Sequence, residues 1–230
     1  MLPAKTPTEA SGFQALLQNR TFLLLWGGQV FSQIADKVLM IMSVGLLTSY
    51  HIPVRFAASA ASYVFLASTI PAILFGAAAG IYIKKKKKKQ IMVVADLIRG
   101  SLLLLLLILP KEFIFLLLIT FTISIVTQAF APAEQSAIPL VVKTENLLTA
   151  NALFTTTQTA SIIVGFAIGE PILAAATNIS KDGAQEIFVA SLYFAAAGLG
   201  QLIKIEEEIN TSNHARKINP WYELKDGFKY

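Results

Sequence analysis

Long apolar runs alternate with short polar breaks along most of the chain. A membrane-spanning helix needs about 20 predominantly apolar residues, and six runs have about that length or more. They cover approximately residues 21–49, 57–83, 91–109, 113–131, 148–176 and 184–205. The breaks contain residues that end helices, namely HIPVR at 51–55, the lysine run at 84–89, PKE at 110–112, PAEQSAIPLVVKTEN at 132–146 and NISKDG at 178–183. The pattern therefore predicts an all-α membrane protein with six transmembrane helices.

The composition agrees with a chain that lies in a bilayer. Hydrophobic residues make up 55% of the 230 positions, charged residues make up 14%, and the mean hydropathy is +0.62. These values are far more apolar than those of a water-soluble domain of this length. The chain has no cysteine, and its two histidines, His51 and His214, are too far apart for a metal motif. No metal site, no cofactor and no enzymatic activity are therefore expected.

The polar segments at the two ends are too short to form a second domain. Residues 1–20 are expected to form a cytoplasmic amino-terminal segment, and residues 21–205 the six-helix transmembrane bundle. Residues 206–230 are expected to form a cytoplasmic linker.

Basic residues divide unevenly between the two sides of the six-span pattern. Three basic residues fall on one side, namely Arg55, Lys111 and Lys181. Fourteen fall on the other, namely Lys5, Arg20, Lys84, Lys85, Lys86, Lys87, Lys88, Lys89, Lys143, Lys204, Arg216, Lys217, Lys225 and Lys229. Because cytoplasmic loops are enriched in Lys and Arg, both termini are predicted to lie in the cytoplasm, in a multi-pass protein of the inner (plasma) membrane.

The lysine run itself has two interpretations. It could be a solvated topology anchor beside an anionic leaflet, or a specific site for a lipid or a nucleic acid. The first interpretation is favoured, so the lipid bilayer is an expected partner and nucleic acid is not.

Polar side chains form stripes on three of the predicted spans. At 100° per residue each stripe stays within a narrow arc of its helix. The stripes consist of Gln29, Gln33, Asp36 and Ser43 in the first span, of Thr120, Ser124, Thr127 and Gln128 in the fourth, and of Asn151, Thr155 and Gln158 in the fifth, which carries Glu170 deeper in the span. Such stripes indicate either a shared water-accessible cavity or hydrogen bonds between packed helices.

Charged residues also fall within the predicted spans. An Asp, Lys or Arg at mid-bilayer costs about 2.5 to 3.5 kcal/mol on insertion scales, so each needs compensation. Asp96 and Arg99 are three residues apart on one helical face, which predicts a structural ion pair near the cytoplasmic end of the third span. Asp36 and Glu170 have no partner nearby in the sequence, so each is a candidate for proton coupling or substrate binding, or for a structural hydrogen bond.

Small residues mark two further positions. GAAAG at 76–80 and GFAIG at 165–169 have the spacing that lets helices approach closely, and this predicts packing at Gly76, Gly80, Gly165 and Gly169. Pro71 and Pro171 offer bend points in the same two spans. These features correspond if spans one to three and four to six form a 3+3 inverted repeat.

Three segments resemble a known family. LLQNRTFLLLWGGQVFSQIAD at 16–36, AFAPAEQSAIPLVVKTENLLTANAL at 129–153 and VGFAIGEPIL at 164–173 resemble a major facilitator superfamily permease of the macrolide and siderophore exporter branch. The resemblance implies the six-helix amino-terminal half of a twelve-helix fold, in which helices one and four line the substrate path. Two positions depart from the family pattern, because Lys84 stands where a loop aspartate is usual and Glu170 precedes Pro171 in the glycine-proline signature.

The resemblance also implies a function. An efflux permease would export a small amphipathic or hydrophobic molecule by alternating access, driven by protons. The expected cavity residues are Gln29, Gln33, Asp36, Thr120, Ser124 and Gln128, and the expected coupling or gating residues are Glu170, Asp96, Arg99, Gly76, Gly80, Gly165, Gly169 and Pro171. A second six-helix half or a homodimer is the expected partner, since INPWYELKDGFKY at 218–230 resembles the segment before helix seven. The alternative is a truncated or vestigial membrane protein, or a half-transporter that acts only as an interaction partner in a dimer.

Overall fold

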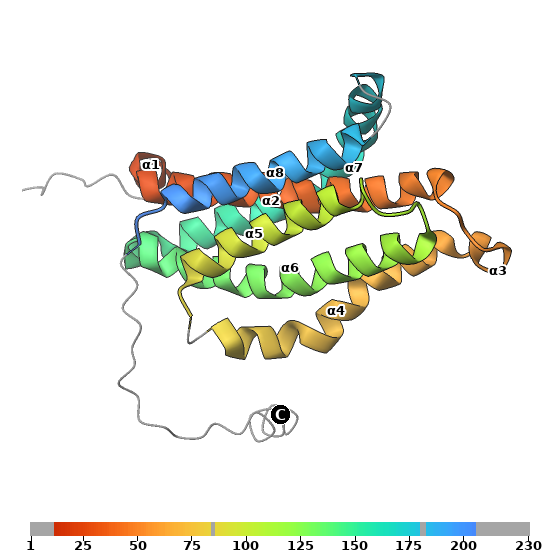
Figure 1. Cartoon of the computed structure of the whole chain (residues 1–230). Coiled ribbons are helices and arrows are strands. Elements are labelled where there is room, and N and C mark those ends of the chain that lie inside the picture. Colours follow the sequence, from red (N-terminus) through yellow and green to blue (C-terminus); the bar gives the residue numbers. More distant parts are fainter. Residues whose placement is uncertain (1–11, 84–85, 180–182, 206–230) are drawn as a thin grey trace, which may run out of the picture.

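The computed structural model describes residues 12–83, 86–179 and 183–205, and these residues are almost entirely helical (Figure 1). Lys84, Lys181 and the predicted linker at 206–230 lie outside the described residues. The elements are α1 (Phe13–Gln18), α2 (Arg20–Gly45), η1 (Leu46–Ser49), α3 (Val54–Ala57), α4 (Ala60–Ile83), α5 (Lys88–Leu105), α6 (Phe113–Val141), η2 (Thr144–Asn146), α7 (Leu147–Ile179) and α8 (Ala184–Leu202).

Four segments of the described chain are long and apolar enough to cross a membrane. They are Arg20–Ser49, Ala60–Gly80, Phe113–Val141 and Thr144–Asn178. The two remaining long helices, α5 and α8, match two of the six predicted spans but fall outside this group. In α5 the reason is its charge, because Lys88, Lys89, Asp96 and Arg99 all lie within this one helix.

The predicted break at 132–146 is wrong in its first part. Helix α6 continues through Pro132 and Pro139 and ends only at Val141. Proline lacks the backbone N–H and its ring disfavours a helical interior, which is why the sequence favoured a loop. In membrane helices such interruptions are tolerated because neighbouring groups satisfy the freed backbone. The extra turns bring Glu134 onto the buried side of the bundle.

Four helices form the centre of the bundle. Helix α2 packs against α7 and α8, α6 packs against α4 and α5, and α5 packs against α8. Helices α5 and α6 follow each other as a hairpin, and α4 and α7 lie at the outside (Figure 1). Both outer helices bend in this view and each contains a proline, Pro71 in α4 and Pro171 in α7.

The apolar core of the described residues consists of two clusters, one toward each end of the bundle. The first includes Val38, Met42, Leu103 and Leu116. The second includes Phe22, Leu25, Met92 and Phe130. Along α2, α5 and α6 a polar layer separates the two clusters, and this layer contains Ser32, Asp96, Arg99 and Thr127.

The glycine motif in α7 packs as predicted, but the one in α4 does so only weakly. A Cβ at Gly165 would collide with the Lys37 side chain, and one at Gly169 would lie 2.6 Å from Ile41 Cδ1. At Gly76 the added atom would make an ordinary contact with Gln128, 3.8 Å away, and at Gly80 it would meet no described atom within 4 Å. The described residues therefore show no close packing at Gly80.

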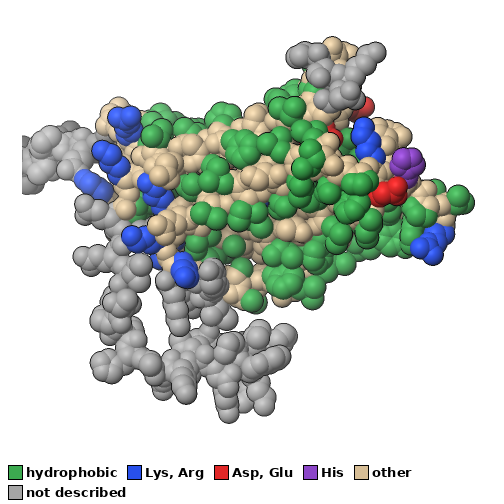
Figure 2. Space-filling view, viewed as in Figure 1, with side chains coloured by type: hydrophobic (Ala, Val, Ile, Leu, Met, Phe, Trp, Pro, Cys, Tyr) green, Lys and Arg blue, Asp and Glu red, His purple; other side chains and the backbone are tan. Residues whose placement is uncertain are grey.

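Basic residues gather at one end of the bundle (Figure 2). This is the end at which α2 begins and α6 ends, and the Asn19 amide joins the two helices by donating to the Val141 carbonyl over 2.6 Å. The described basic residues at this end are Arg20, Lys86, Lys87, Lys88, Lys89, Lys143 and Lys204, against Arg55 and Lys111 at the other. Here α1 covers the bundle through its buried Leu16, so part of the predicted polar segment 1–20 is helical and packed.

Candidate functional site

Arg99 occupies the centre of the polar layer and is fully buried. Its guanidinium forms an ion pair with Asp96, one turn earlier on α5, and a second with Asp36 on α2, where Nη1 lies 3.1 Å from Oδ1. Nη2 also donates to Ser32 Oγ over 2.9 Å, and Ser32 donates to Asp96 over 3.2 Å. One cation therefore holds carboxylates from two helices, and most of this network is closed to solvent.

Two aromatic rings and a tyrosine hydroxyl complete the surroundings of the guanidinium. The Arg99 Cζ atom lies 4.2 Å from the centre of the Phe130 ring and 4.7 Å from that of Tyr193. The Tyr193 hydroxyl donates to Asp36 Oδ1 over 2.6 Å. Asp36 thus accepts from both α5 and α8, so this one carboxylate joins three helices. We call Asp36, Asp96, Arg99, Ser32 and Tyr193 the Arg99 cluster.

The predicted pair of Asp96 and Arg99 forms, but its position differs from the expectation. Both residues lie at mid-length of α5, between the two apolar clusters, rather than near the cytoplasmic end of the span. Asp36 was expected to lack a local partner. Its partners come from residues 63 and 157 positions away in the chain, and no sequence pattern could indicate them.

A cavity of about 220 Å³ opens on one side of the Arg99 cluster, between α2, α4 and α6. Four of the predicted cavity residues line it, namely Asp36, Thr120, Ser124 and Gln128. Ser43 and Thr127 from the same stripes and Ser68 from α4 also take part. Asp36 and Ser43 of the first-span stripe therefore face the stripe of the fourth span across a shared space, which we call the Asp36 cavity.

A second cavity, of about 300 Å³, lies on the other side of the cluster, between α2, α6 and α7. Its lining includes the predicted residues Gln29 and Gln33, the α7 stripe of Asn151, Thr155 and Gln158, and also Glu134 and Gln135. We call it the Glu134 cavity. Glu134 was not predicted as a site residue, because the segment that carries it was expected to be a loop. A carboxylate placed two residues after Pro132 was the only available signal.

Glu170 does not reach either cavity. Its side chain is exposed on α7, whereas the buried stripe of that helix consists of Ser161, Gly165, Gly169 and Leu173. Pro171 is exposed as well. The structure therefore does not bring these two predicted residues together with the Arg99 cluster.

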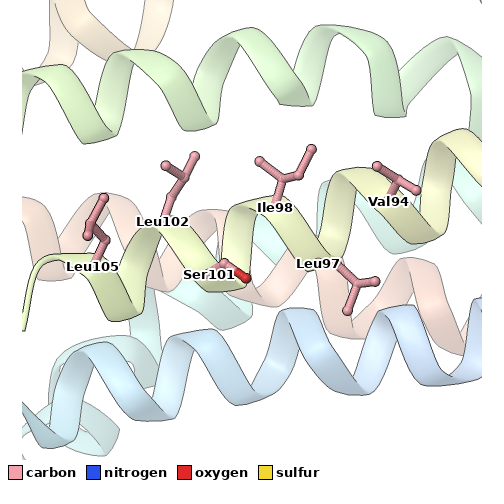
Figure 3. Close-up of a pocket in the computed structure, with 6 residues that line it drawn as sticks. All are labelled: Val94, Leu97, Ile98, Ser101, Leu102 and Leu105. Atoms are coloured by element: carbon pink, nitrogen blue, oxygen red, sulfur yellow. The ribbon is translucent and has the colours of Figure 1, made fainter.

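A third hollow lies on α5 itself and is apolar (Figure 3). Ser101 contributes its only polar side chain, and the other lining residues are Val94, Leu97, Ile98, Leu102 and Leu105. Several of them are exposed. This face of α5 is thus suited to contact hydrocarbon chains, and the helix carries its charges on another face.

The sequence comparison gives one family. Residues 25–228 match the model of the Major Facilitator Superfamily, which is more than half of the chain. No curated protein sequence and no solved structure matches it. The helical architecture, the apolar spans and the matched family agree, and we conclude that this chain belongs to the major facilitator superfamily.

Proposed function

We propose that this chain is an efflux permease that exports a small amphipathic or hydrophobic molecule by alternating access, driven by protons. That it is a membrane transporter, and not an enzyme, follows from its family. The observation that carries the finer proposal is the pair of cavities. One lies on each side of the Arg99 cluster, and α2 and α6 line both. A substrate path with a closure at its centre has this arrangement.

The proposed architecture is six membrane spans in a 3+3 inverted repeat. In this repeat α2 corresponds to α6, α4 to α7 and α5 to α8. The packing follows this correspondence, because α2 packs on α7 and α8, and α6 packs on α4 and α5. This correspondence supports the repeat. The excess of Lys and Arg at one end of the bundle supports a plasma-membrane protein with that end, and both termini, in the cytoplasm.

Asp36 is the proposed coupling residue. It lines the Asp36 cavity and also accepts hydrogen bonds from Arg99 and Tyr193. Protonation of Asp36 would weaken its attraction to the guanidinium, so proton uptake and the contact between α2, α5 and α8 would be linked. Separation of these helices would open a path between the two cavities.

The exposed faces of α4 and α7 favour a complex as the active form. Large apolar side chains on these helices are exposed, among them Ile73, Leu74, Ile163 and Phe166, and Glu170 lies on the same helix as the last two. A second six-helix half, or a second copy of the chain, could cover these faces, and Glu170 would then act in gating at that interface. If no transport occurs, the remaining interpretation is a vestigial protein or an interaction partner in a dimer.

The proposal is tested in liposomes that contain DNA and the purified chain. Ethidium that enters the lumen binds the DNA and becomes fluorescent, so accumulation under an imposed pH gradient can be followed directly. We expect accumulation with the wild-type chain and its loss with Asp36→Asn, which keeps the shape of the side chain but cannot lose a proton.

Glu112→Gln is the matched control, because the Glu112 side chain is half exposed at the end of the bundle. It should transport as the wild type does. If Asp36→Asn still accumulates ethidium with the same pH dependence, Asp36 has no part in coupling. If the wild-type chain itself does not transport, the interaction-partner alternative is supported.

A further inference from the structure

Glu134 is a buried carboxylate that the protein itself does not fully satisfy. Helix α6 carries it past Pro132 into the bundle, where only 3% of its surface is exposed. Its Oε1 atom is buried and makes no hydrogen bond with any described group. A buried acceptor without a donor costs free energy, so a donor that reached this side chain would remove that cost.

A second buried acceptor belongs to the same cavity. Gln29 on α2 is also 3% exposed, and its Oε1 has no hydrogen-bond partner among the described groups. The orientation of this amide is fixed, because its Nε2 donates to the Phe154 carbonyl on α7 over 3.1 Å. A flipped amide would place two oxygens against each other. Glu134 and Gln29 both line the Glu134 cavity, and each contributes one buried oxygen atom that has no donor among the described groups.

Among the described residues, no cation forms an ion pair with Glu134. Arg99 interacts with it electrostatically, but Arg99 already forms ion pairs with Asp36 and Asp96. The part of the chain that the structure describes contributes no lysine or arginine to the lining of the Glu134 cavity. Lys37 lines the other cavity, on the far side of the cluster. Glu134 is thus a third carboxyl group close to a guanidinium that already pairs with two others.

The cavity has the size and access for part of an organic molecule. Its volume of about 300 Å³ lies at the lower limit of ligand pockets, which hold roughly 300 to 1,000 Å³. Its α7 wall contains the buried Phe154 and the exposed residues Asn151, Thr155 and Gln158, so the cavity opens beside that helix. No described group of three His, Asp or Glu side chains is arranged to hold a metal ion, which favours an organic cation over a metal.

We infer that the Glu134 cavity binds the ammonium or guanidinium group of an organic cation, with Glu134 as counter-ion and Gln29 Oε1 as a second acceptor. This inference rests on the proposed function, because it names amphipathic cations as the substrate class of the proposed permease. The binding itself needs no transport. A proton held by Glu134 is the competing interpretation, and the test below separates the two.

The test measures binding to the full chain in nanodiscs of zwitterionic phosphatidylcholine. The two probes share one frame and differ in charge: 4-phenylbutylamine is a cation at neutral pH, and 4-phenyl-1-butanol is neutral. Trp26 serves as the reporter, because it lies on α2 one turn before Gln29 and donates to Thr157 on α7 over 2.8 Å. Trp221→Phe in every variant removes the other tryptophan of the chain.

We expect the amine to bind at least about ten-fold more tightly than the alcohol, which is the scale of one hydrogen-bonded charge pair. Glu134→Gln should abolish this preference and leave the affinity for the alcohol unchanged. Glu134→Asp should reduce the preference but keep it. Glu112→Gln, the exposed matched control, should keep it in full.

Equal affinities of the wild-type chain for amine and alcohol would overturn the inference and would favour a protonated Glu134. Retention of the full preference in Glu134→Gln would overturn it as well. If Glu134→Gln does not give folded protein, two measurements still test the inference. They are the affinities of the wild-type chain for amine and alcohol, and the reduced preference expected for Glu134→Asp. The nanodisc assay measures equilibrium binding and does not depend on transport. If the chain binds the amine selectively but does not transport ethidium, the permease proposal is contradicted and the binding inference stands.

Discussion

Removal of the Arg99 side chain is the most direct test of the polar layer. Arg99→Met keeps much of the length and the apolar part of the side chain but removes its charge. Asp36 and Asp96 then remain in the bundle without their shared cation, and Ser32 Oγ loses a donor at 2.9 Å. The contacts of the guanidinium with the rings of Phe130 and Tyr193 are also lost.

The expected loss follows from the burial of this cluster. Arg99 is fully buried, and removal of one partner from a buried ion pair costs roughly 3 to 5 kcal/mol. For a chain of this size, each kcal/mol corresponds to about 2 to 4 °C in Tm, so the expected fall is roughly 6 to 20 °C. The triple variant Arg99→Met, Asp36→Asn, Asp96→Asn should recover more than half of this loss, because it removes both carboxylates that form ion pairs with Arg99 together with the cation.

The measurement is thermal unfolding in nanodiscs, followed by circular dichroism. Lys111→Met is the control, because it removes an exposed cation at the end of the bundle and should not change the Tm. A single variant that melts within about 2 °C of the wild type, a loss of less than about 1 kcal/mol, would refute the role assigned to Arg99. A triple variant less stable than the single one would refute the charge argument.

Three further contacts are tested by the same measurement of Tm. Tyr193→Phe removes the hydrogen bond to Asp36 and should cost about 0.5 to 1.5 kcal/mol; an unchanged Tm would contradict this contact. Gly165→Ala forces α7 away from α2 and should lower the Tm, whereas Gly80→Ala, which meets no described atom within 4 Å, should not. A larger loss of Tm in Gly80→Ala than in Gly165→Ala would contradict the packing. Asn19→Ala removes the N-cap of α2, in which the Asn19 side chain accepts a hydrogen bond from a backbone N–H over 3.1 Å. The change should cost about 1 kcal/mol of stability. An unchanged Tm would show that this cap is not needed.

The sequence indicated which helix faces are polar, because such faces are a local property. Gln29, Gln33 and Ser43 recur at helical spacing and all three are buried, and Ser43 lies across the Asp36 cavity from the stripe of the fourth span. A period of 3.6 residues is enough to place side chains on one arc. The helical period cannot show which helix lies across from that arc. The polar stripes could therefore be predicted, but their division between two cavities could not.

The partner of Asp36 could not be predicted for the same reason. The Arg99 cluster depends on how α2, α5 and α8 pack, and these helices are far apart in the chain. Only the pair of Asp96 and Arg99 is local, and it alone was predicted. Glu134 was missed because two prolines suggested a loop, whereas the surrounding bundle keeps α6 helical to Val141.

The shared guanidinium also has a consequence for how the chain is made. Helices enter the bilayer from the ribosome in chain order, and α2 carries Asp36 into the translocon 63 residues before Arg99 is synthesised. Asp96 and Arg99 can neutralise each other as soon as α5 forms, because they lie on one helix. Asp36 has no such partner and is costly in lipid until α5 arrives. We therefore expect α2 to remain beside the translocon until α5 is complete, so the Arg99 cluster sets an order of assembly as well as a centre for the finished bundle.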